Sequence, residues 1–106
     1  MKKLLWMAGC ALLVASGPSL AANPVAGQEK AKTCAACHGP DGNSTAPDFP
    51  RLAGQNFDYL VKALADYKAG ERKNAIMAPQ AANLSQRDIE DLAAYFSRQH
   101  GLTVKY

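Results

Sequence analysis

The sequence predicts an all-α domain of three main helices joined by long loops. Apolar residues recur at three- and four-residue steps in residues 57–67 and again in residues 89–96, which is the spacing of one helix face. A further helix is expected from about Val25 into the segment CAACH, because this stretch contains many good helix formers. The sequence shows no sustained alternation of apolar and polar residues, the pattern that strands produce. Helices packed on helices are therefore the expected architecture.

The first 21 residues have the pattern of a secretory signal peptide. Lys2 and Lys3 precede an apolar run that extends to about Val14, and small residues follow it up to Ala21. The run is short for a membrane-spanning helix, so we expect cleavage after Ala21 or Ala22 and no stable membrane anchor. This pattern predicts an exported, periplasmic protein whose single domain comprises residues 22–106.

The exported domain is small and nearly neutral. Two of the 12 basic residues leave with the signal, so ten basic residues remain against nine acidic ones, and this balance indicates no nucleic-acid partner. A domain of this length is short of what a protein core alone comfortably stabilises. Its cysteines, Cys34 and Cys37, enter an oxidising compartment in which free thiols seldom persist. We therefore expect both cysteines to be covalently bonded, and we expect an additional group to stabilise the domain.

Residues 39–83 are predicted to form two loops with a helix between them. Residues 39–55, GPDGNSTAPDFPRLAGQ, are rich in glycine and proline and predict a loop too long for an ordinary connector. A helix is expected next, with Gly70 at its C-terminal end. The residues of its inward face are Phe57, Leu60, Val61, Leu64 and Tyr67. Residues 71–83 show no sustained period and contain a proline, so they predict a second loop with room for one helical turn.

The last helix has the strongest start signal. Ser85 and Asp88 form a Ser-x-x-Asp capping box, and Leu84 and Ile89 are spaced as a hydrophobic staple. The helix is expected to end near His100, followed by a short tail.

The segment CAACH admits three interpretations. A thioredoxin-type redox pair is expected after a strand, and no strand is predicted before Cys34. A structural zinc site needs four ligands, and beyond Cys34, Cys37 and His38 the mature chain offers one further histidine, His100. The third interpretation uses every residue: cysteines three apart bond the two vinyl groups of a haem, and the next histidine binds its iron. The sequence C-x-x-C-H is the attachment signature of c-type haem.

The sixth ligand of such an iron is expected to be a methionine. Met1 and Met7 leave with the signal, so Met77 remains as the candidate. It follows the second helix in a predicted loop, from which it can approach the iron on the face opposite His38. His100, at the polar end of the last helix, is the alternative ligand. Histidine and methionine together fill both axial positions and raise the reduction potential relative to two histidines.

Four segments carry a family resemblance. CAACHGPDG, FPRLAGQ, NAIMAP and LSQRDIEDLAAYFS resemble the class I c-type cytochromes, in particular the short bacterial cytochromes c553 and one half of the two-haem cytochrome c4. The resemblance covers essentially the whole mature chain. It implies the class I cytochrome c fold, in which the N- and C-terminal helices cross and the loops wrap one covalently attached haem. A single CxxCH limits this chain to one haem c.

The resemblance also implies roles for individual residues. Cys34 and Cys37 would form the thioethers, and His38 and Met77 would be the axial ligands. The carbonyl of Pro50 would accept the N–H of the proximal imidazole, and Leu52 would pack on the porphyrin.

These expectations lead to a functional hypothesis of electron transfer, not enzymatic catalysis. The chain would be a soluble periplasmic one-electron carrier, a monomer or homodimer, with redox proteins as donor and acceptor. The alternative is a haem subunit stably bound to a redox enzyme such as a flavoprotein dehydrogenase. The charged residues around the second helix, Arg72 among them, are interspersed with acidic ones and are expected to form a solvated surface.

Overall fold

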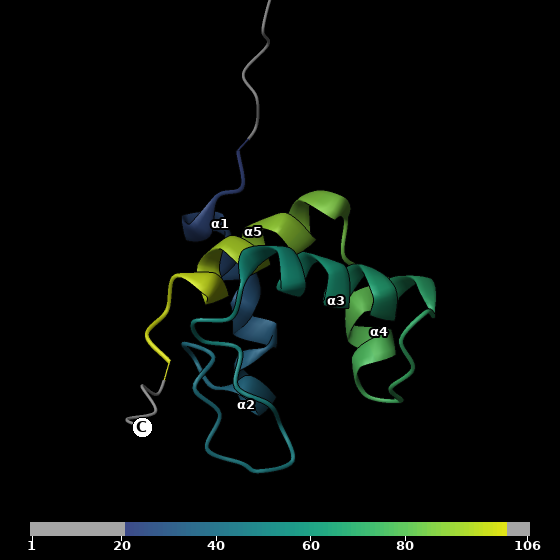
Figure 1. The fold of residues 1–106 in the computed structure, drawn as a ribbon, viewed down its shortest axis with the longest axis horizontal. Coiled ribbons are helices and arrows are strands. Elements are labelled where there is room, and N and C mark those ends of the chain that lie inside the picture. The colour runs from purple at the N-terminus through teal and green to yellow at the C-terminus, as the bar shows by residue number, and fades with distance from the viewer. Residues whose placement is uncertain (1–20, 102–106) are drawn as a thin grey trace, which may run out of the picture.

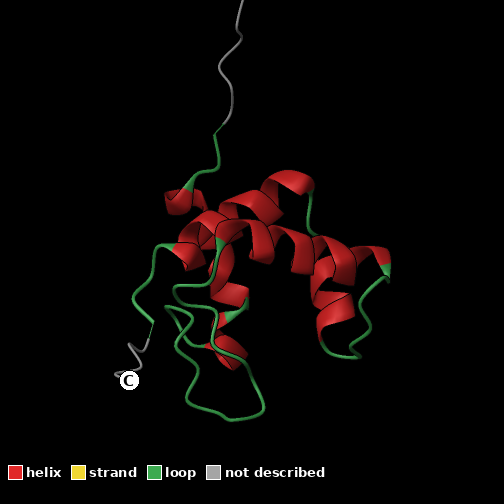
Figure 2. Ribbon diagram, viewed as in Figure 1, coloured by secondary structure: helices red, strands yellow, loops and turns green. Residues whose placement is uncertain are grey.

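Helices dominate residues 21–101, the part of the chain described by the computed structural model (Figure 1). In chain order the elements are α1 (Pro24–Lys30), the 3₁₀ turn η1 (Ala31–Thr33), α2 (Ala35–His38), α3 (Phe57–Ala69), α4 (Met77–Ala82) and α5 (Gln86–Ser97). No strand occurs among residues 21–101 (Figure 2), and the predicted all-α class is confirmed. The predicted signal peptide lies outside the described residues except for Ala21, and so do residues 102–106.

The first predicted helix is divided into three pieces. It begins where the Asn23 side chain accepts hydrogen bonds from the amides of Val25 and Ala26, and it ends at Gly39, whose φ is +83°. The expectation of one helix as far as CAACH was wrong at residues 31–34. There the Cys34 amide donates to the Ala31 carbonyl at 2.9 Å, so the helical path tightens into a 3₁₀ turn before α2 begins.

The apolar face of α3 contacts the core in part and lines a neighbouring hollow in part. Gly70 ends the helix in the left-handed conformation, with φ 79°, as the sequence predicts. Of the predicted inward residues only Leu60 is fully buried, and Leu64 and Tyr67 are half-buried because they line a hollow next to the core. Phe57 departs from the prediction and is 37% exposed, since it lies in the first turn of α3.

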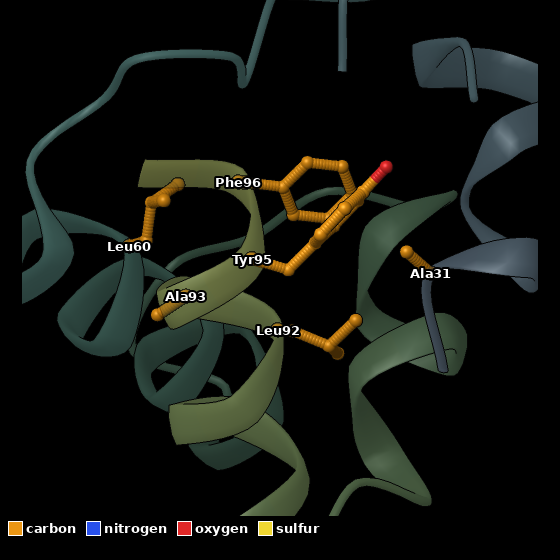
Figure 3. Packing of buried hydrophobic residues seen from close by; sticks show 6 residues of the cluster. All are labelled: Ala31, Leu60, Leu92, Ala93, Tyr95 and Phe96. Carbon is orange, nitrogen blue, oxygen red and sulfur yellow. The ribbon is translucent and has the colours of Figure 1, made fainter. Parts of the chain in front are cut away.

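The core lies between α3, α5 and η1 (Figure 3). Leu60 comes from α3 and Ala31 from η1, while α5 contributes Leu92, Ala93, Tyr95 and Phe96. The Tyr95 and Phe96 rings pack at 5.1 Å between centroids. The Tyr95 hydroxyl donates to the Pro40 carbonyl at 2.8 Å, so this buried polar group also links the long loop to α5.

The terminal helices cross at very short range. A Cβ on Gly27 of α1 would lie 1.9 Å from the carbonyl oxygen of Asp91 in α5, so only glycine allows this approach. The Asp91 carboxylate is 2% exposed and accepts from the Asn23 amide at 2.8 Å and from Lys30 Nζ at 2.7 Å. The crossing of N- and C-terminal helices implied by the family resemblance is confirmed.

The loop of residues 39–56 folds back onto α5. The Gly42 carbonyl accepts from the amides of Leu52 and Ala53, and the Gly54 amide donates to the Phe96 carbonyl at 2.9 Å. Gly42 has φ +84°, and a Cβ there would lie 2.8 Å from the Phe96 ring. These bonds hold Pro50 and Leu52 at a defined place beside the core.

The predicted capping box at the start of α5 is confirmed. The Asp88 amide donates to Ser85 Oγ at 3.0 Å, and the Ser85 amide donates to Asp88 Oδ2 at 2.9 Å. Lys30 Nζ lies 2.9 Å from Asp88 Oδ1. The Ser85 amide first, and Lys30 after it, lower the pKa of Asp88 to about 2.

We expect Asp88→Asn to reduce stability in a pH-dependent way. Because the folded pKa lies below the usual value of about 3.9, the carboxylate stabilises the fold above about pH 4, and this contribution disappears as the pH falls toward about 2. The variant should lose about 1 kcal/mol of unfolding free energy at pH 7, a value reduced for solvent screening of the partly exposed side chain. Denaturant titrations between pH 7 and pH 2 measure the difference. Glu71→Gln, which removes an exposed carboxylate elsewhere, is the control, and equal losses at pH 7 and pH 2 in Asp88→Asn would contradict the linkage.

Candidate haem-binding site

The six predicted site residues line one continuous hollow. It consists of two adjoining parts with about 990 and 850 Å³ of free space, open mouths included. In Figure 1, α2 and α4 both lie below the layer of α3 and α5, apart from one another. Cys34, His38, Pro50 and Met77 line both parts, Leu52 lines the first, and Cys37 lines the second.

Cys34 and Cys37 lie in one helical turn. The amides of Cys37 and His38 both donate to the Cys34 carbonyl, at 3.2 and 2.9 Å. Both side chains are half-buried and form no disulfide within residues 21–101, and burial raises the pKa of the Cys34 thiol. A redox-catalytic cysteine needs a lowered pKa, so the environment of Cys34 is unlike that of a thioredoxin-type pair.

His38 ends α2 and is almost fully buried, at 5% exposure. Its Nδ1 lies 2.8 Å from the Pro50 carbonyl oxygen. A carbonyl can only accept, so Nδ1 bears the proton and the lone pair of Nε2 is free to bind a metal. The Phe49 ring meets the imidazole edge-on at 6.3 Å. Pro50 and Phe49 therefore fix the orientation of the imidazole, and a bond of this kind makes the ring a better ligand.

Met77 is held at the start of α4 by a residue that the sequence prediction missed. The Asn74 side chain accepts hydrogen bonds from the amides of Ile76 and Met77, each at 2.9 Å. The sequence signal that could have indicated this role is an asparagine three positions before the helix, because asparagine side chains often accept hydrogen bonds from nearby amides in Asx-turns. The competing ligand His100 is exposed and lines neither part of the hollow.

The donors and walls of the hollow fit a haem. Two thiols, an imidazole with a free Nε2 and a thioether face a space whose other walls are largely apolar. Those walls come from α3 and α5 and include Leu60, Leu64, Leu92 and Phe96. A large apolar ring with a central metal matches this set of groups.

A comparison of the sequence with protein-family models identifies the family. The cytochrome c family model matches residues 24–99. The chain belongs to the cytochrome c family. This cytochrome c has one haem c as its cofactor, attached covalently through Cys34 and Cys37.

Its relatives include both long and short cytochromes. It is 52% identical over 79 residues to cytochrome c4 of Pseudomonas aeruginosa, a match that covers 74% of this chain and 39% of that protein. It is 46% identical over 82 residues to cytochrome c-554(548) of Halomonas halodenitrificans, which covers 74% of this chain and 99% of that protein. The chain spans about two fifths of the length of the cytochromes c4.

A solved structure agrees with the fold. Reduced recombinant cytochrome c4 from Pseudomonas stutzeri superposes with a TM-score of 0.74 and 49% identity, over 77% of this chain and 48% of that one. The class I cytochrome c fold is thereby confirmed, as is the resemblance to one half of a cytochrome c4. Among residues 21–101 of this cytochrome c, no helix has the length and apolar composition needed to cross a membrane.

Proposed function

We propose that this cytochrome c is a one-electron carrier in which His38 and Met77 are the axial ligands of the haem iron. When bound, the haem supplies an iron that can accept and release one electron. The observation on which the proposal rests is the His38–Pro50 hydrogen bond of 2.8 Å, because it leaves Nε2 of a buried imidazole as a metal ligand in the same hollow as Met77.

The protein side chains leave little room for bond-making chemistry at the metal. Nε2 of His38 would supply one ligand to the iron and the Met77 thioether the other, so that a substrate would have no open coordination position. The walls that α3 and α5 contribute are largely apolar, so they would shield a bound haem from water on that side. Because the His38 ring is hydrogen-bonded to Pro50 and the Met77 amide to Asn74, a change of iron charge would require little movement of the chain.

The exposed side chains around the hollow suit brief contact with redox partners. Ile76, next to Met77, lines the second part of the hollow and is 55% exposed. Together with Ala36, which is also exposed on this side, it offers a small apolar contact area. We propose that the carrier works in the periplasm after removal of residues 1–21 and exchanges electrons with redox proteins there.

A potentiometric titration of the protein purified from a periplasmic extract tests this function. We expect a single one-electron Nernst curve, a low-spin spectrum in both oxidation states and slow binding of added cyanide. Gel filtration of the extract should place the haem absorbance at the size of a monomer or dimer. A high-spin ferric spectrum with rapid cyanide binding would contradict two protein axial ligands, and elution with a larger redox enzyme would contradict a diffusing carrier.

A further inference from the structure

Arg72 folds back along α3 after that helix has ended. Its amide donates to the Asp66 carbonyl at 3.1 Å, and its guanidinium carbon lies 4.8 Å from the centroid of the Tyr67 ring. Its Nη1 donates to Tyr59 Oη at 3.2 Å. All three side chains, those of Tyr59, Tyr67 and Arg72, line the first part of the hollow. The guanidinium is therefore held in a fixed place by a ring below it and a hydroxyl beside it.

The face of α3 next to this guanidinium forms part of the wall of the hollow. Tyr59, Ala63 and Tyr67 follow one another at four-residue steps, so they share one face of the helix. All three line the hollow. The small side chain of Ala63 lies between the two tyrosines along this face.

Arg72 forms no salt bridge within residues 21–101, and of the causes that raise its pKa the hydrogen bond to Tyr59 is the largest and the charge of Asp66 the smallest. The ion pairs found within residues 21–101 are formed by Lys30, Lys32, Lys62 and Arg87. The cation–π and hydroxyl contacts of Arg72 use one face of its guanidinium and one of its five N–H donors. Tyr59 Oη accepts from Arg72, so its own proton is free to be donated to another acceptor. The cluster thus presents several donors and one positive charge at the rim of the hollow.

We infer that Arg72 and Tyr59 bind a propionate carboxylate of the haem. The propionates are the anionic groups of a haem c, and a guanidinium binds a carboxylate through two parallel N–H donors. The Tyr59 hydroxyl adds a third donor. The inference rests on the proposed haem site, and Arg51, which lines the same part of the hollow, is the competing cation.

The pH dependence of the reduction potential tests this pairing in the holoprotein. Ionisation of a haem carboxylate changes the potential, so a plot of potential against pH breaks at the pKa of that carboxylate. A cation within about 4–6 Å lowers a carboxylate pKa by about 1–3 units. In Arg72→Gln we therefore expect the break to move up by about 1–3 pH units. We expect a smaller upward movement in Tyr59→Phe, and Arg72→Lys should retain part of the wild-type behaviour.

Lys73→Gln is the matched control. It removes the same charge from the next residue, which is exposed and lines neither part of the hollow, and the break should stay at its wild-type pH. An unchanged break in Arg72→Gln, an equal movement in Lys73→Gln, or a movement confined to Arg51→Gln would overturn the inference. The haem spectrum and the sulfur-to-iron band report attachment and axial ligation separately. Their absence in the wild type would overturn the proposed function, whereas intact spectra with an unmoved break overturn only the role of Arg72.

Discussion

Met77→Ala is expected to abolish the far-red sulfur-to-iron charge-transfer band of the oxidised protein and to lower its reduction potential. The thioether favours ferrous iron, so its removal stabilises the ferric state. The fall should be a sizeable part of the range of about 0.8 V that axial ligands span in haem proteins. Met77 is half-buried at the first position of α4 and lines both parts of the hollow. Absorption spectroscopy with potentiometric titration measures both effects.

Two companion variants make the Met77 result decisive. Ile76→Ala removes the neighbouring side chain, which is 55% exposed, and should keep both the band and the potential. His100→Ala should also leave them unchanged, because His100 lies outside the hollow. A band that persists in Met77→Ala, or that disappears in His100→Ala, would show that Met77 is not the ligand.

Gly27→Ala is expected to destabilise the fold by about 2–3 kcal/mol. In an isolated helix this change gains up to about 1 kcal/mol, so the expected effect has the opposite sign to helix propensity. The cause is the distance of 1.9 Å between the new Cβ and the Asp91 carbonyl oxygen. That oxygen belongs to the backbone of α5 and cannot rotate away, so α1 and α5 must separate. For a domain of this size the melting temperature should fall by about 10–20 °C.

The control for Gly27→Ala lies one residue away. Gln28→Ala changes an exposed position of the same helix, and its melting temperature should stay within a few degrees of the wild type. Thermal melts of the two holoproteins, followed by circular dichroism, make the comparison. If Gly27→Ala melted at or above the wild-type temperature, the close crossing of α1 and α5 would be incorrect.

Helix caps and helix ends were predictable, because each depends on residues that are close together in the sequence. Ser85 and Asp88 are three residues apart and cap α5 by themselves, and Gly70 ends α3 through its own backbone freedom. The need for glycine at position 27 could not be predicted, because the atom that would clash belongs to Asp91 in another helix. The same holds for residues 31–34, where packing of Ala31 into the core accompanies the tightened turn.

The candidate site was predictable where the chemistry of a residue type is distinctive. Two cysteines and a histidine in a fixed spacing indicate haem attachment, and a single methionine outside the predicted signal peptide makes Met77 the candidate second ligand. Asn74 and Arg72 were missed for physical reasons. Asparagine is common in loops, and Arg72 lies in a run of mixed charge that predicts a solvated surface. Only the folded chain brings its guanidinium over Tyr67 and against Tyr59, which is 13 residues earlier.

The crossing of α1 and α5 also determines how late in folding the domain can close. Asn23 and Asp91 are 68 residues apart, and four of the six core residues belong to α5, which is made after every other described helix. Contacts between such distant residues form only once the intervening chain has been brought together. A chain in which α5 has not yet packed therefore presents the CAACH segment without its closing helix. We therefore expect Cys34 and Cys37 to be more accessible to covalent attachment before α5 packs than in the folded chain, where both are half-buried.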